Sequence, residues 1–186
     1  MIKDLLNQGA CIDAFGVGDN LITSHSDPVF NGVYKVVAVE DDEGNITPRI
    51  KISENVEKIT TPHFKKIYRL YGKDGKAIAD QICVYDETID DSKPLRIFDP
   101  DATWKTKTLK DFRAREIMVP IIKGGELIYD MPSLTDIRDY CAAQIDTLWD
   151  EVKRFTNPHH YYVDMSQKLW DVKNDLLHSA RTDSQN

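Results

Sequence analysis

The sequence predicts an α+β protein in which one unit of parallel α/β type is followed by antiparallel hairpins and two C-terminal helices. Three observations favour this class. An apolar segment near the N-terminus runs into a glycine turn, short β-type segments are separated by Asp-Gly or Gly-Gly turns, and apolar residues after position 133 recur at helical spacing. With 186 residues, 41% of them hydrophobic, the chain suits one domain or one domain plus a fragment.

The N-terminal unit is predicted to run helix, strand, glycine turn, helix. Residues 2–10 have apolar positions on one helical face, and residues 11–15 form an apolar strand-like segment. The turn at residues 16–18 precedes a short helix at 19–23, where Asp19 or Asn20 can serve as the cap. This order is typical of a parallel α/β barrel or a doubly wound sheet, so we expect the neighbouring strands to come from another part of the protein.

Antiparallel pairing is predicted for the middle of the chain. A helical period is absent there, and Gly or Asp residues mark each reversal. Residues 89–112 are rich in loop-forming residues, and we predict no regular element in them. Three hairpins are expected, joining 33–40 to 46–52, 66–71 to 77–85, and 117–122 to 127–129.

Two helices are predicted at the end of the chain. A capping box of Ser133 and Asp136 begins the first, and its apolar stripe continues to Phe155. A second capping box, formed by Asp164 and Gln167, begins the last helix.

Composition narrows the classes of function. The net charge of −7 provides no basic face for nucleic acid or anionic lipid. Cys11, Cys83 and Cys141 are odd in number and widely separated, which argues against a disulfide framework and a structural zinc site. The five histidines lack metal-ligand spacing, so we assign no metal site. No secretory leader or membrane-spanning apolar run is present, and we expect a cytoplasmic protein.

The glycine turn is the segment whose residue types suggest ligand chemistry. Without Cβ atoms, backbone N–H groups can approach a phosphate closely, and the following helix start adds partial positive charge. A G-x-G turn is often only a tight turn, and the Asp19 carboxylate would repel a phosphate, so the motif alone is a weak signal. Asp13 could hold a sugar hydroxyl or Mg²⁺, although a solvent-facing role is simpler. The candidate phosphate-binding residues are Gly16, Val17, Gly18, Asp19, Asn20 and Thr23.

Several segments together resemble the C-terminal part of nicotinate phosphoribosyltransferases of the long bacterial type. They follow the order and spacing of that family from about Ile12 to Leu177. The matching segments are residues 12–24, 32–38, 50–55, 57–60, 132–134, 148–154, 157–159 and 166–171.

The resemblance implies an enzyme of NAD salvage that forms nicotinate mononucleotide and pyrophosphate from nicotinate and phosphoribosyl pyrophosphate. ATP hydrolysis drives the reaction, Mg²⁺ is required, and members typically act as homodimers. In this family an irregular α/β barrel adjoins a domain built from both chain ends. Residues 1–30 would then be the terminal portion of the barrel with its phosphate-cradling glycine turn, and residues 31–186 the C-terminal β-rich and helical domain.

Two departures from the family pattern stand out. His63 occupies a position where members often have Gly, and Asp19 one where many have Thr. The family's phosphorylated His and its nicotinate-binding Tyr and Arg belong to sequence upstream, so we assign no catalytic residue to this chain. We therefore expect the chain to be inactive without the missing N-terminal part. The alternatives are a non-catalytic assembly or regulatory module and, as the weakest, a free-standing binder of phosphate esters.

Overall fold

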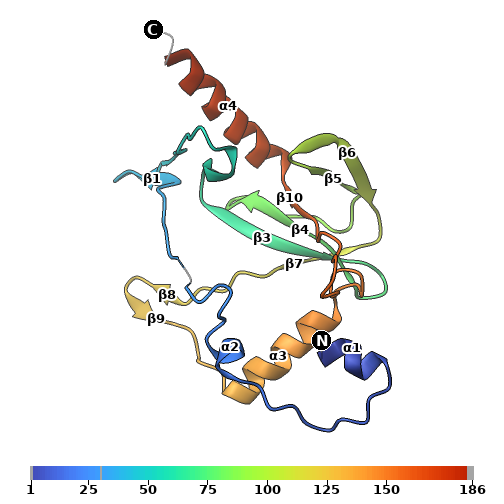
Figure 1. The fold of residues 1–186 in the computed structure, drawn as a ribbon. Helices are drawn as coiled ribbons and strands as arrows, with labels where there is room; N and C mark the ends of the chain where they lie inside the picture. The colour runs from blue at the N-terminus through green and yellow to red at the C-terminus, as the bar shows by residue number, and fades with distance from the viewer. Residues whose placement is uncertain (1, 30, 184–186) are drawn as a thin grey trace. The chain divides into compact units, whose positions relative to one another are not determined.

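The computed structural model describes residues 2–29 and 31–183. The chain divides into two compact units, Met1–Tyr34 and Lys35–Asn186. Across the described residues the structure is α+β, with four α-helices and several small sheets (Figure 1), as the sequence predicts. None of the described helices is long and apolar enough to cross a membrane.

The first unit contains two short helices, α1 (Ile2–Asn7) and α2 (Asp19–Ile22). Helix α1 is followed by Gly9, whose φ of +79° is a left-handed conformation that favours glycine at a helix end. The predicted strand at residues 11–15 is wrong: the segment is irregular and exposed. The physical reason is that a parallel strand needs a hydrogen-bonded neighbour, and the described part of this unit contains no other strand.

The hairpin predicted after residue 33 is present but shorter than expected. Strand β1 (Ala38–Glu40) pairs antiparallel with β2 (Ile46–Pro48). The turn between them is held by Asp41, whose Oδ1 accepts hydrogen bonds from the N–H groups of Glu43 at 3.0 Å and Asn45 at 2.8 Å. A short 3-10 helix, η1 (Val56–Lys58), follows.

A four-stranded sheet in the order β10-β4-β3-β7 forms the centre of the second unit (Figure 1). The predicted hairpin of β3 (Lys65–Tyr71) and β4 (Ala77–Val84) is confirmed. Its turn depends on Gly75, which has φ +75°. Strand β7 (Arg113–Glu116) pairs antiparallel with β3, and β10 (Val163–Met165) pairs parallel with β4.

Two further hairpins accompany this sheet. Residues 89–112, for which no element is predicted, contain β5 (Leu95–Asp99) and β6 (Ala102–Leu109), so that prediction is wrong. The turn between them uses no glycine: Asp99 Oδ1 accepts from the N–H groups of Asp101 at 2.9 Å and Ala102 at 3.2 Å. The third predicted hairpin is confirmed over a short length, as β8 (Ile122–Lys123) and β9 (Glu126–Leu127).

The two C-terminal helices differ in packing. Helix α3 (Leu134–Asp146) begins at the predicted capping box, with Ser133 Oγ accepting from the N–H of Asp136 at 3.2 Å. It has no buried residue and ends at Asp146, nine residues before Phe155, so its predicted length is wrong. At the C-cap Thr147 the hydrogen bonds tighten from i−4 to i−3, with the N–H groups of Thr147 and Leu148 donating to Gln144 O at 3.1 Å and Ile145 O at 3.0 Å.

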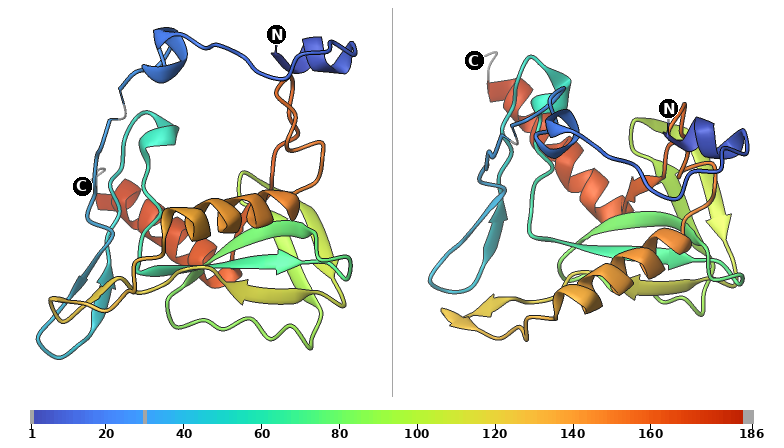
Figure 2. Two further views of the ribbon diagram at one scale, coloured as in Figure 1. Left: turned by 90° about the horizontal axis from the view of Figure 1, so that it is seen from below. Right: turned by 60° about the horizontal axis from the view of Figure 1, so that its bottom comes forward.

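Helix α4 (Gln167–Asp183) follows directly from β10 and runs to the C-terminal end of the described chain (Figures 1 and 2). Its cap is Ser166, whose Oγ accepts from the N–H of Leu169 at 3.2 Å. The predicted capping box of Asp164 and Gln167 is therefore wrong, because Asp164 lies inside β10.

Two apolar cores hold the second unit together. Strand β4 contributes to both, because successive side chains point to opposite faces of a strand, whereas β3 contributes only to the larger core. The smaller core joins α4 to the sheet through Val84, Met165 and Leu169, with Ile82 and Trp170 packed against it. The larger core comprises Tyr68, Leu70, Ala79, Cys83, Ile97, Leu109 and Phe112.

Candidate functional site

The glycine turn precedes α2 as the sequence predicts, and it is exposed throughout. Gly18 is the N-cap, with φ −92° and ψ −173°, so the expected caps Asp19 and Asn20 are instead the first two residues of the helix. A Cβ atom added to Gly16 or Gly18 would meet nothing within 4 Å. Packing within this chain therefore does not require glycine at either position, and space beside the turn is open.

The helix start offers hydrogen-bond donors in the geometry that anions use. Within the described residues, the N–H groups of Asp19 and Asn20 donate to no carbonyl, as is usual for the first turn of a helix. Thr23 behaves differently, because its Oγ1 donates to Asp19 O at 2.8 Å and so closes the C-terminal end of α2. The structure thus places residues 16–20 together at the start of α2. The Thr23 hydroxyl proton is used in a hydrogen bond within the helix.

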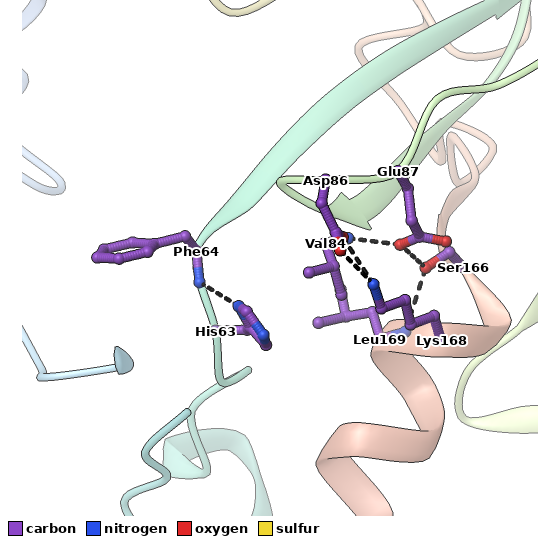
Figure 3. A network of polar contacts seen from close by, with 8 residues as sticks. All are labelled: His63, Phe64, Val84, Asp86, Glu87, Ser166, Lys168 and Leu169. Carbon is purple, nitrogen blue, oxygen red and sulfur yellow. Dashed lines mark hydrogen bonds and ion pairs between the residues drawn. The ribbon is translucent and has the colours of Figure 1, made fainter. Parts of the chain in front are cut away.

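A second polar group lies where β4 ends and α4 begins (Figure 3). Glu87 Oε2 accepts from the N–H of Val84 at 2.6 Å and from Ser166 Oγ at 2.7 Å. Since Ser166 also caps α4, one carboxylate connects the end of the strand to the start of the helix. All of these groups satisfy one another, which indicates a structural role.

An ion pair extends the same group toward solvent. Lys168 Nζ donates to Asp86 Oδ1 and Oδ2 at 2.7 and 2.6 Å (Figure 3). The hydrogen bond from Lys168 lowers the pKa of the Asp86 carboxyl, and the same bond raises the pKa of the Lys168 amine. Both side chains are about half exposed, at 47% and 48%, so the pair adds little to stability.

His63 lies beside this ion pair in an unusual backbone conformation. Its φ is +76°, in the left-handed region that glycine adopts most easily. The ring Nδ1 accepts from the N–H of Phe64 at 3.0 Å, and the ring stacks at 5.7 Å from Tyr85. Burial lowers the pKa of His63, so the neutral ring that this hydrogen bond requires is favoured.

A buried acid that sequence reasoning misassigned lies on β10. Asp164 is 5% exposed. Burial, assisted by the nearby charge of Asp99, raises the pKa of its carboxyl to about 6. The pattern that suggested a helix cap was ambiguous, because Ser166 two residues later is an equally good cap. No local sequence signal distinguishes the two positions.

A polar clamp fixes the segment before β10. Arg69 Nε and Nη2 donate to the two carboxylate oxygens of Asp80, each at 2.8 Å. Tyr161 donates its hydroxyl proton to Asp80 Oδ1 at 2.9 Å, and the Arg69 guanidinium lies 5.8 Å from the Tyr161 ring centre. Bidentate pairs of this kind are geometrically specific, so the clamp positions the chain that leads into β10.

Solved structures include the same fold. The crystal structure of human nicotinic acid phosphoribosyltransferase matches 72% of this chain and 26% of that chain, with a TM-score of 0.61 and 22% identity. By fold, the chain is thus an α+β module of the kind found within that larger protein. The chain belongs to the nicotinate phosphoribosyltransferase C-terminal domain family, whose sequence model matches residues 64–173.

Relatives bearing that enzyme's name match almost the whole chain. The Bacillus subtilis (strain 168) nicotinate phosphoribosyltransferase is 40% identical over 182 residues, which are 97% of this chain and 37% of the relative. The Dictyostelium discoideum protein of the same name is 34% identical over 92% of this chain and 30% of its own length. The chain spans about a third of the length of these relatives.

Proposed function

We propose that this chain is the C-terminal portion of a nicotinate phosphoribosyltransferase. It contributes to forming nicotinate mononucleotide from nicotinate and phosphoribosyl pyrophosphate, with ATP hydrolysis, in NAD biosynthesis in the cytoplasm. The observation that carries the proposal is the 40% identity to the Bacillus subtilis enzyme across 97% of the chain. Because the chain spans 37% of that relative, the proposed activity requires the remainder of such an enzyme, in a homodimer.

The proposed role of the glycine turn is to bind the 5′-phosphate of the phosphoribosyl group. The open space beside Gly16 and Gly18 supports it, and so do the N–H groups at the start of α2 that no carbonyl of the described chain engages. The Asp19 carboxylate opposes it by charge, so binding depends on the backbone and on Asn20 rather than on Asp19. Helix α2 has only four residues, which limits the contribution of its dipole.

Catalytic groups are proposed to lie outside this chain. Among the described residues, no group of three or more His, Cys, Asp or Glu side chains could hold a metal ion. We propose that the Mg²⁺ and ATP that the family resemblance implies are bound by the remainder of the enzyme.

The test is an assay of nicotinate mononucleotide formation from nicotinate, phosphoribosyl pyrophosphate, Mg²⁺ and ATP. The purified chain is assayed alone and after mixing with a separately produced N-terminal portion of the Bacillus subtilis relative. We expect product only in the mixture. Product from the chain alone would show that the catalytic groups are present here, and inactivity of a mixture that forms a complex would contradict the proposed function.

A matched pair of variants tests the turn within that mixture. Gly18→Val is expected to raise the KM for phosphoribosyl pyrophosphate with little effect on folding, because its Cβ has open space in this chain but would obstruct a phosphate. Gly32→Val also enters open space, outside the turn, and is expected to leave the KM unchanged. An unchanged KM for Gly18→Val would refute the assignment of the turn.

A second candidate function is a non-catalytic assembly or regulatory module. Helix α3 favours it, because none of its 13 residues is buried and apolar side chains such as Leu134 and Tyr140 are exposed. Light scattering after size exclusion distinguishes the two, since an assembly module associates without the remainder of the enzyme. A monomeric chain that becomes active only in the mixture would rule it out.

A further inference from the structure

A cleft of about 390 Å³ opens in the second unit between the β5–β6 hairpin and strand β10. Its apolar walls include Ile97, Phe98 and Tyr162, and its polar lining includes Asp164, Lys105 and Lys107. The volume falls within the range of small-molecule sites in proteins. No residue of the glycine turn lines this cleft, so it is a separate feature from the proposed phosphate site.

The most buried polar residue that lines the cleft is Asp164. Asp164 is 5% exposed, yet no hydrogen bond or ion pair within the described residues engages its side chain. Its partner across the parallel pair β10–β4 is Gln81, a residue that is 3% exposed. Gln81 Oε1 is buried and also lacks a hydrogen-bond partner. Within the described residues, the Gln81 amide oxygen and the carboxyl group of the buried residue Asp164 therefore both lack a donor, although buried polar groups in proteins are almost always paired.

The opening of the cleft has the opposite charge. Lys105 and Lys107 lie on β6 and are exposed, and Lys105 Nζ forms a long ion pair, 3.7 Å from Asp99 Oδ2. The remaining oxygen of Asp99 accepts two backbone N–H groups of its own turn. The cleft thus runs from an acceptor-rich interior, past aromatic walls, to a basic rim.

The change from buried acceptors inside the cleft to lysines at its rim favours a ligand with hydrogen-bond donors at one end and negative charge at the other. Adjacent N–H donors on a planar ring fit a carboxylate in a bidentate arrangement. Aromatic walls favour a flat ring between them, and lysines at a rim attract an anionic group. We propose that the cleft binds a small planar heterocycle that carries N–H donors at its inner edge and a phosphate-like anion at its outer end.

Isothermal titration calorimetry of the full chain with guanosine monophosphate tests the proposal, since this probe carries both features. Inosine monophosphate lacks the exocyclic amino group, and guanosine lacks the phosphate. We expect guanosine monophosphate to bind with a Kd below about 1 mM and each of the other two to bind about tenfold more weakly, the effect of one lost charged hydrogen bond.

Two variants locate the binding. Asp164→Asn is expected to weaken guanosine monophosphate about tenfold or more, and Lys107→Ala to weaken guanosine monophosphate but not guanosine. Asp139→Asn on α3 and Lys110→Ala, both exposed and outside the cleft, are the matched controls. Absence of binding at millimolar probe, or binding that Asp164→Asn leaves unchanged while the variant remains folded by circular dichroism, would overturn the proposal.

Discussion

Replacing Asp164 by Asn is expected to stabilise the chain at neutral pH. The structure raises the pKa of this carboxyl from its ordinary value of 3.8 to about 6, through burial and the charge of Asp99. Because the folded protein holds the Asp164 proton more tightly than the unfolded chain does, protonation of Asp164 stabilises the fold. This stabilisation is fully present below pH 3.8 and is lost as the pH rises through about 6.

The magnitude follows from that pKa difference. Protonation of Asp164 is favoured in the folded state by roughly 3 kcal/mol, since each pKa unit corresponds to about 1.4 kcal/mol. About 2 kcal/mol of this difference develops between pH 4.5 and pH 7.5. The stability advantage of the Asn variant over the unmodified chain should therefore grow by about 2 kcal/mol across this interval.

Urea denaturation at a series of pH values measures the effect. The control is Asp86→Asn, which removes an exposed carboxyl whose pKa is lowered by Lys168. Its effect has the opposite sign, because the stabilisation from Asp86 is present above pH 3.8 and is lost as the pH falls further. A free-energy difference between Asp164→Asn and the unmodified chain that does not change with pH would refute the burial argument.

Three structural predictions test the remaining packing, each by urea denaturation. Leu169→Ala, at a side chain with 0% exposure, should lower the free energy of unfolding by about 2–5 kcal/mol, whereas Leu134→Ala, at 83% exposure, should change it by less than about 0.5 kcal/mol. Gly75→Ala should cost about 1–2 kcal/mol because φ is +75°, and Gly32→Ala, with no positive φ, should not destabilise. Ser133→Ala should cost about 1 kcal/mol and reduce the helical circular dichroism, and an unchanged spectrum would show that α3 forms without its cap.

Local signals in the sequence predict a large part of the fold. The β3–β4 hairpin follows from a turn with Asp74 and Gly75, where geometry within four residues determines the reversal. The start of α3 is predicted because Ser133 and Asp136 interact over three positions. In each case the residues that decide the structure are close in the chain.

Elements that depend on distant partners could not be predicted in the same way. Strand β10 has three residues, and its pairing partner in β4 lies about eighty positions earlier. The β5–β6 hairpin was missed because its turn contains Asp99 and Pro100 instead of glycine, and residues 103–108 are exposed on both faces and show no apolar alternation.

The two candidate sites, the glycine turn and the cleft, also differ in whether nearby or distant residues form them. The glycine turn is recognisable from Gly16 and Gly18 alone, whereas the cleft becomes visible only when β5, β6 and β10 come together. Asp164 illustrates the difficulty, since a polar residue between Val163 and Met165 is equally compatible with a solvent-facing strand position, a cap or a buried acid.

Strand β10 is synthesised long after β4, its partner in the sheet, and this order affects how the second unit folds. During synthesis β4 is complete once Val84 has been made, but the strand and helix that cover its outer edge begin only at Val163. The hydrogen bond between Ser166 and Glu87 closes a loop of 79 positions, which is slow compared with forming the β3–β4 hairpin. Until that loop closes, the free edge of β4 is available for pairing with another nascent chain.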